Sequence, residues 1–416
     1  MKHGRWLWLP LVLTGCMGTC PDRGESCPKA EPGAGVQPVS AARLAVLEHY
    51  PPVPLRSDLG EAPVPCEREL VLYALTSVEK VIDLRKDRDP ANCGRGDHAK
   101  ALGCYGATFT LSPPDTVRPD DRVGIGRPEN LGKTFNAIVR FSNSEPKNVP
   151  DFRSATTGFA VKVMLEPAHY PKDDFLPDGA DMQDFVAGGL KTFVASNIAD
   201  YADLFQLRIH QYSNALCIRE RHPQAFRVFG IDPWLRYLNP SSSAAPIVLE
   251  ERFSSLVPYA WGNSAVKYRF EPCEKKTFDR DAYSFSRFDA GYQAKLISEF
   301  LESNDICYVM TIQKRPRPGS ADERAAIEEA FPVEDAMVYW PDDPQGATNG
   351  LSAEFREVAR LTIKAGAPRI EDEVCEKLSF NPWNGLKAHQ PLGSLNRARW
   401  AVYRESKSFR TGACAE

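Results

Sequence analysis

The chain has 416 residues, of which 43% are hydrophobic and 25% are charged, a composition typical of a globular protein. Its formal net charge at pH 7 is -4 and no long basic run occurs, so the sequence lacks the positive surface that binding to nucleic acid requires. A chain of this length can form one large domain or two of ordinary size.

The N-terminus has the pattern of an export signal. A basic start precedes the apolar run Trp6–Leu13, which is too short to span a bilayer as a helix. The run leads into Leu13-Thr14-Gly15-Cys16, which resembles the lipobox of bacterial lipoproteins, so we expect residues 1–15 to be removed and Cys16 to be lipidated. Met17, where an Asp would favour the inner membrane, points to the outer membrane. The expected location is the bacterial cell envelope, with acyl chains on Cys16 as the membrane contact; an ordinary secretory signal is the alternative.

Of the 11 cysteines, ten remain after Cys16. An even number in an exported chain is compatible with disulfide bonds, but spacing alone leaves their pairing open. Cys93 and Cys104 flank His98, so a bond between them is one candidate. No pair has zinc-finger spacing and no Cys-x-x-Cys-His motif occurs, which excludes a thioether-linked haem.

The predicted elements follow a stretch rich in proline and glycine. Residues 16–65 are expected to form a tether and an N-terminal arm, and residues 66–416 the folded domain. From Cys66 to Leu84 apolar residues recur at helical spacing, which predicts the first helix. The predicted strands, where apolar residues alternate with small or polar ones, are Tyr105–Leu111, Asn136–Ser142, Gly158–Met164, Ala265–Phe270, Cys307–Gln313 and Glu357–Ile363, with a helix at Ala321–Phe331 before the last. Their connections are too short for crossover helices throughout, which favours an antiparallel sheet.

Four residues in these elements have side chains suited to proton transfer or to binding iron. His98 precedes the first strand, and a neutral imidazole there can accept and return a proton near neutral pH, although a single histidine is more often structural. On the second strand, Ser142 shares a face with an arginine two residues before it. Arg399 and Tyr403 are four residues apart and share a helix face. A guanidinium beside a phenol favours the phenolate, which is a strong ligand for ferric iron.

In this order, the motifs resemble those of the catalase superfamily. Catalases carry Arg-x-x-His-Ala-Lys, Val-Arg-Phe-Ser, Gly-Phe-Ala-Val-Lys and Arg-x-x-x-Tyr, and the matching residues here are Arg95–Lys100, Val139–Ser142, Gly158–Lys162, and Arg399 with Tyr403. The resemblance covers roughly residues 66 to 410. It is closest to compact catalase-related haem proteins, which end shortly after the proximal tyrosine.

The resemblance implies an α+β fold, in which an antiparallel β-barrel of about eight strands is surrounded by helices and haem b lies between the barrel and a C-terminal proximal helix. His98 would be the distal acid and base, and Ser142 would fix its tautomer. Tyr403 would be the axial ligand of the haem iron, with Arg399 stabilising the phenolate. The other implied cofactor-binding residues are Arg95, Arg140 and Arg410, which match positions that pair with the haem propionates, and Tyr201, at the position of an aromatic ring over the haem.

Two departures from the catalase pattern bear on activity. Catalases carry a distal Asn in the stretch that aligns with Ala187–Phe193, and this sequence has none there. Asp97 directly precedes His98, where a carboxylate would favour the protonated imidazole and weaken it as a base.

We therefore expect a haem-dependent peroxidase with weak catalase activity, which acts on hydrogen peroxide or organic hydroperoxides with a small organic reductant. One alternative is a fatty-acid hydroperoxide isomerase or lyase of the allene oxide synthase type. Another is a haem-free surface lipoprotein on a catalase-like scaffold. Small members of the family often associate as dimers, so the resemblance also implies a homodimer.

Overall fold

The computed structural model describes residues 47–88, 95–96, 98–144, 150–151, 156–166, 170–177, 181–202, 247–278, 289–343 and 350–413. In these ranges, no helix is both long and apolar enough to cross a membrane. The predictions for residues 1–15, for Cys16 and for Asp97 concern parts of the chain outside them.

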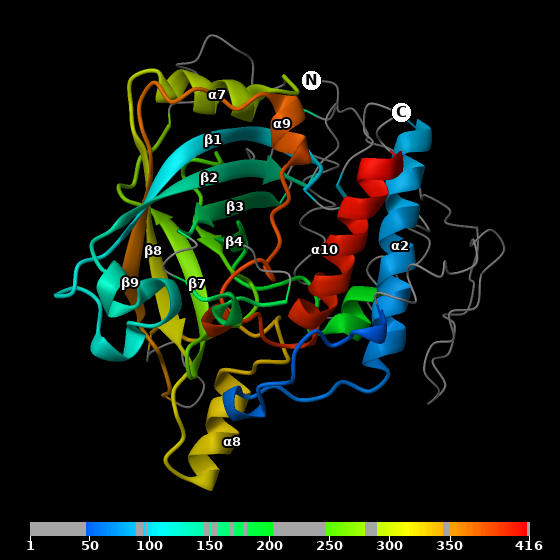
Figure 1. Cartoon of the computed structure of the whole chain (residues 1–416), viewed down its shortest axis with the longest axis vertical. Helices are drawn as coiled ribbons and strands as arrows, with labels where there is room; N and C mark the ends of the chain where they lie inside the picture. The colour runs from blue at the N-terminus through cyan, green and yellow to red at the C-terminus, as the bar shows by residue number, and fades with distance from the viewer. Residues whose placement is uncertain are drawn as a thin grey trace, which may run out of the picture.

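Within the described residues, nine strands form one antiparallel sheet (Figure 1). They are β1 (Lys100–Leu111), β2 (Thr134–Asn143), β3 (Thr157–Met164), β4 (Met182–Gly188), β5 (Phe253–Ser254), β6 (Tyr259–Trp261), β7 (Ser264–Pro272), β8 (Ile306–Lys314) and β9 (Phe355–Ile363). Their order is β5-β4-β3-β2-β1-β9-β8-β7-β6, and β5 also pairs with β7. This extra pairing closes eight strands into a barrel and leaves β6 as an extension of β7. The predicted α+β fold with an antiparallel barrel of about eight strands is confirmed.

Strand β2 shows how the sequence builds both faces of the barrel wall. Phe135, Val139 and Phe141 alternate along it and belong to the main hydrophobic core, because side chains in a strand point to opposite faces in turn. Arg140 and Ser142 lie on the other face, yet they are also buried. Polar side chains are rarely buried without a reason, so this face of β2 must be covered by another part of the chain.

Aromatic rings pack together in the barrel interior. The ring of Phe159 on β3 stacks on Phe253 of β5 at 4.6 Å between centroids and lies 5.0 Å from Tyr308 of β8. Such pairs add to the free energy of burial. The stacking of Phe253 holds the two-residue strand that closes the barrel.

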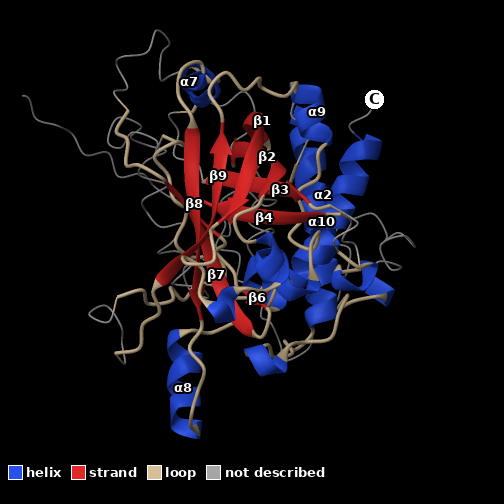
Figure 2. Cartoon of the chain, turned by 60° about the vertical axis from the view of Figure 1, so that its left-hand side comes forward, coloured by secondary structure: helices blue, strands red, loops and turns tan. Residues whose placement is uncertain are grey.

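In the described part of the chain, five α-helices lie around the barrel and beyond its ends (Figure 1). They are α2 (Glu67–Arg88), α7 (Tyr292–Leu301), α8 (Ala321–Ala330), α9 (Asp372–Lys377) and α10 (Ser394–Ala413). Helices α2, α9 and α10 lie on the same side of the barrel (Figure 1 and Figure 2). Leu70, Ala74 and Val78 of α2 share a second hydrophobic cluster with Ala398 and Val402 of α10. The helices predicted at Cys66–Leu84 and Ala321–Phe331 correspond to α2 and α8.

All six predicted strands are present, but β4, β5 and β6 were not predicted. Strand β4 is the longest of these three. Its second and third residues, Gln183 and Asp184, are polar although they are buried, so the usual apolar alternation is absent. Asp184 instead forms an ion pair of 2.7 Å with Lys162 on β3. This cross-strand pair replaces the apolar contacts that periodicity can detect.

The predicted disulfide between Cys93 and Cys104 is wrong. Cys104 of β1 is bonded to Cys375 of α9, with 5.8 Å between their Cα atoms and 271 residues between them in sequence. Because the bond joins elements that are distant in sequence and meet only in the folded structure, local spacing carries no signal for it. A second disulfide, Cys273–Cys307, joins the end of β7 to the start of β8.

Helix α10 is fastened by a buried cluster of charges. The guanidinium of Arg397, 2% exposed, donates to Glu61 at 2.6 Å, to Glu67 at 2.7 Å and to Glu334 at 3.0 Å. The three carboxylates come from the N-terminal arm, the start of α2 and the segment after α8. One side chain therefore joins three separate segments to α10.

We predict that Arg397→Ala strongly destabilises the fold. It would leave three carboxylates without their cation, and breaking a buried ion pair costs about 3–5 kcal/mol. Arg360→Ala is the matched control, because Arg360 is 54% exposed and pairs with Glu357 on the surface, where a pair is worth ~0–1 kcal/mol. The free energies of unfolding are to be compared by denaturant titration; equal losses in the two variants would contradict the prediction.

Candidate functional site

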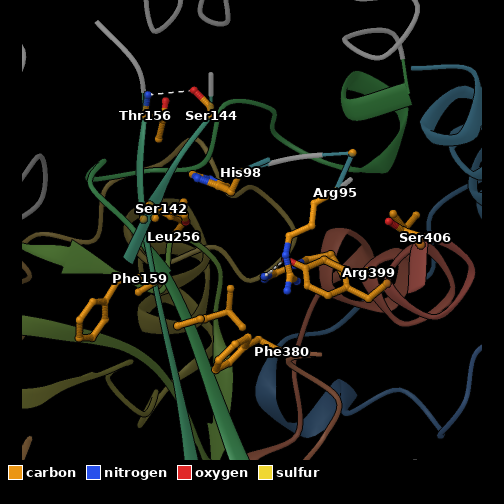
Figure 3. Close-up of a pocket in the computed structure, with 18 of the residues that line it drawn as sticks. Arg95, His98, Ser142, Ser144, Thr156, Phe159, Leu256, Phe380, Arg399 and Ser406 are labelled. Atoms are coloured by element: carbon orange, nitrogen blue, oxygen red, sulfur yellow. Dashed lines mark hydrogen bonds between the residues drawn. The ribbon is translucent and has the colours of Figure 1, made fainter. Parts of the chain in front are cut away.

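A pocket of about 250 Å³ lies between the barrel wall and α10 (Figure 3). The barrel contributes Arg140, Ser142 and Gly158 to its lining, and α10 contributes Arg399 and Tyr403. The buried polar face of β2 is thus the inner wall of this pocket. Elements that are distant in sequence meet here because α10 is docked beside the barrel.

His98 lies immediately before β1 and projects into this pocket (Figure 3). Its φ of 50° is in the left-handed region, which a residue with a side chain adopts at a cost. Arg140 stabilises this backbone by donating from Nη2 to the carbonyl oxygen of His98 at 3.0 Å. A strained backbone held by a buried neighbour is typical of functional sites.

The sheet register brings Ser142 and Gly158 to the same place as the imidazole. Ser142 of β2 pairs with Gly158 of β3. A Cβ atom at residue 158 would lie 2.5 Å from Nδ1 of His98 and 2.6 Å from Oγ of Ser142. Only glycine leaves room for both side chains, so the structure brings His98 and Ser142 to one wall of the pocket.

Arg399 and Tyr403 face the pocket from α10. Nη2 of Arg399 donates to the Tyr403 oxygen at 2.9 Å, while Nη1 donates to Asn396 at 3.0 Å and to the Tyr259 oxygen at 3.3 Å. Burial disfavours the charge on Arg399, but the neighbouring phenols Tyr403 and Tyr259 raise its pKa above the usual value. The guanidinium therefore stays cationic and can stabilise negative charge on the Tyr403 oxygen.

Arg95 and Arg140 lie at the same end of the pocket. Nη2 of Arg95 donates to the carbonyl oxygen of Leu378 at 2.6 Å. Both arginines approach the carboxylate of Glu376 on α9, each at 3.8 Å. Burial lowers the pKa of Arg95, and the charge of Glu376 opposes that shift. Sequence analysis did not identify Glu376 as part of the site.

Of the two remaining predicted residues, Tyr201 can be placed in the structure and the side chain of Arg410 cannot. Tyr201 lines the pocket, and its ring lies 5.2 Å from that of Phe193. Arg410 falls in the last turns of α10, where side chains lie outside the described part of the structure. The pocket thus contains His98, Ser142, Arg95, Arg140, Tyr201, Arg399 and Tyr403 of the predicted set.

The stretch that lacks an Asn forms part of the pocket lining. Ala187, Gly188, Leu190 and Phe193 all line the pocket, and no Asn or Gln occurs among the described residues of the lining. Leu256 adds a further apolar side chain to the lining. Apart from His98, the polar side chains of the described lining are hydroxyls, guanidinium groups and the ammonium group of Lys407.

Phe380 lines the pocket, although it lies outside the sequence motifs and was not predicted. Its ring lies 5.4 Å from Nζ of Lys162, and the segment that carries it is fixed to Asp184, which accepts from the backbone nitrogen of Asn381 at 2.9 Å. Burial raises the pKa of Asp184, and Lys162 opposes that shift. The cross-strand pair of β3 and β4 therefore positions one apolar wall of the pocket.

The pocket has the charge of a site for an anion. Arg95, Arg140, Arg399 and Lys407 line it, and no Asp or Glu does so among the described residues of the lining. Groups of three or more His, Cys, Asp or Glu that could hold a metal ion are absent from the described part of the chain.

Comparisons with known proteins identify the fold. No family model matches the sequence, and no curated protein matches it either. Among solved structures, a fungal catalase is similar, with 17% identity and a TM-score of 0.57 over 77% of this chain and 60% of that chain. Catalase A from Saccharomyces cerevisiae has 15% identity and a TM-score of 0.53 over 76% of this chain and 61% of that one.

A bacterial catalase gives the same result, with 16% identity and a TM-score of 0.54 over 80% of this chain and 61% of that chain. The chain thus spans about three fifths of the length of these catalases. At such identities the likeness shows a shared fold.

We predict that Gly158→Ala displaces the imidazole and destabilises the protein. The added methyl group would overlap His98 and Ser142, and overpacking of this kind costs ~1–3 kcal/mol. Gly106→Ala on β1 is the control, because a Cβ atom there meets nothing within 4 Å. Denaturant unfolding measures both variants, and a Gly158→Ala protein as stable as the control would show that the wall is more open than the structure indicates.

Proposed function

We propose that this chain is a haem b-dependent peroxidase with weak catalase activity. The observation that carries the proposal is that one pocket combines His98 and Ser142 on the barrel wall with the hydrogen-bonded pair Arg399–Tyr403 on α10. A histidine suited to acid–base chemistry and a phenol that could bind ferric iron thus line the same pocket. The fold shared with catalases supports this proposal.

The residues of the pocket fit haem b by their charge, their apolar surface and an oxygen ligand for iron. The propionates of haem are anionic, and the described lining is cationic, with Arg95 and Arg140 at one end. Phe380 and Val402 provide apolar surface for a flat ring system. Tyr403 offers an oxygen ligand that suits ferric iron.

Each residue has a defined part when haem is bound. The iron of haem supplies the redox chemistry by which the O–O bond of a peroxide is cleaved. Tyr403 would hold the iron through its phenolate oxygen, and Arg399 stabilises that charge from 2.9 Å. His98 takes a proton from the incoming peroxide and returns it to the departing oxygen. Arg140 keeps the imidazole in place through the His98 carbonyl group.

The lining favours peroxidase over catalase chemistry. Efficient hydrogen peroxide disproportionation needs a second peroxide held close to the iron, and an amide beside His98 would help to orient it. The described lining has small residues there instead, including Ala187 and Gly188. An organic hydroperoxide or an organic reductant therefore has both the space and the apolar contact that it needs.

The apolar lining also supports a second candidate. Leu190, Phe193, Val194 and Leu256 line the pocket, and such surface suits the hydrocarbon chain of a fatty-acid hydroperoxide. A hydroperoxide isomerase or lyase would convert that substrate without a reductant. Product analysis with and without an organic donor distinguishes the two reactions.

We also propose how the chain is delivered and anchored. The support is the lipobox-like sequence: residues 1–15 would act as a signal peptide, Cys16 would carry acyl chains at the outer membrane of a bacterial envelope, and residues 66–416 would form the haem domain. Association as a homodimer remains part of this proposal.

We predict that the protein without its first 16 residues, supplied with haem, shows a Soret band with high-spin ferric features. Tyr403→Phe removes the proposed axial ligand and should shift or abolish this spectrum. Tyr339→Phe is the matched control, since Tyr339 is 38% exposed and absent from the described pocket lining. An ultraviolet–visible spectrum identical in wild type and Tyr403→Phe, or a colourless wild type, would refute the assignment.

We predict that His98→Gln lowers peroxide-dependent oxidation of an organic donor by roughly 10²–10⁴-fold, because the acid–base group is lost. The haem spectrum should persist, since His98 is not the proposed axial ligand. Stopped-flow assays with matched haem content measure the effect. In the wild type, oxygen release from hydrogen peroxide should be slow next to donor oxidation; fast oxygen release without a donor would disprove the peroxidase assignment.

A further inference from the structure

The carboxylate of Glu376 lies between two arginines of the pocket. Its Oε2 is 3.8 Å from Nε of Arg95, and its Oε1 is 3.8 Å from Nη2 of Arg140. The side chains of Arg140, Arg95 and Glu376 are 4%, 15% and 22% exposed. One oxygen of the chain's own carboxylate is thus directed to each guanidinium.

Glu376 is held in this position by covalent and hydrogen-bonded contacts. The residue before it, Cys375, is fully buried and bonded to Cys104 of β1. Arg95 donates to the backbone carbonyl of Leu378, two residues after it, at 2.6 Å. By contrast, Glu373 on the same short helix is 78% exposed and pairs with Lys377. Glu376 is therefore a fixed part of the structure around the pocket, not a mobile surface group.

This arrangement changes the charge that a ligand meets. The negative charge of Glu376 lies 3.8 Å from a nitrogen of each of the cationic residues Arg95 and Arg140 and reduces the positive potential that they produce. Glu376 does not line the pocket itself, so it acts on a ligand through the two arginines and through its own field. A carboxylate that binds these arginines lies near a like charge at low exposure, which disfavours it.

We propose that Glu376 tunes the charge preference of this end of the pocket: its carboxylate, 3.8 Å from each guanidinium, weakens the binding of an anionic cofactor group at the Arg95–Arg140 pair. The proposal rests on the proposed haem function, since it concerns the propionates of haem. It assigns Glu376 a role in ligand selection in addition to its structural contacts.

The test compares the binding of two forms of the cofactor to the wild type and to variants of Glu376 and Glu373. Haem b, with two free propionates, and haem b dimethyl ester, with none, are titrated into wild type, Glu376→Gln and Glu373→Gln, with the Soret band as the readout. The dissociation constant of the ester divided by that of free haem measures how strongly each protein prefers the charged cofactor. A purely structural effect of the substitution would change both constants alike and leave this ratio unchanged.

Removal of one nearby like charge should strengthen the preference of Glu376→Gln for free haem over the ester by about tenfold. Glu373→Gln should behave as wild type, and Glu376→Asp, which retains the charge, should keep a ratio near the wild-type value. Glu376→Ala gives a second neutral variant if Glu376→Gln does not fold. If a neutral variant has a ratio equal to or lower than that of the wild type, the proposal for Glu376 is overturned while haem binding stands. If the wild type takes up no haem, both the proposal for Glu376 and the proposed haem function are overturned.

Discussion

The position of α10 depends on the buried guanidinium of Arg397. This side chain is bound by Glu61, Glu67 and Glu334, and a buried cation of this kind is tolerated only when its partners are complete. Arg399 is two residues further along the same helix and Tyr403 is six. The cluster that joins the arm, α2 and the segment after α8 therefore also sets where the phenol and its guanidinium partner face the barrel.

The barrel supplies the other half of the site, and it does so through a face that a strand normally exposes. Aromatic rings such as Phe141 and Phe159 fill the interior, while Arg140 and Ser142 on the alternate positions of β2 line the pocket. The absence of a side chain at Gly158 admits the imidazole of His98. The strained backbone of His98 is held by the hydrogen bond from Arg140 to its carbonyl oxygen. Packing inside the barrel and chemistry outside it thus depend on the same strands.

The pocket differs in character from one built only for hydrogen peroxide. Its described lining is cationic and partly apolar, with hydroxyl groups but no amide beside the imidazole. Glu376, fastened through Cys375 to β1, moderates the positive charge at one end. These features are the ones on which we base the proposal of an anionic cofactor and an organic peroxide or reductant.

The sequence by itself determined the features that depend on residues close together in the chain, namely the local secondary structure and the short motifs. Periodicity predicted α2 and six of the strands, and the ordered motifs around His98, Ser142 and Tyr403 predicted residues that the structure brings into one pocket. Strand β4 was missed because the buried Lys162–Asp184 pair replaces apolar alternation. The Cys104–Cys375 bond and the approach of Glu376 to Arg95 join positions 271 and 281 residues apart. Only closure of the barrel and docking of the helices decide such contacts, because periodicity and propensity act over a few residues and carry no information about which distant segments will meet.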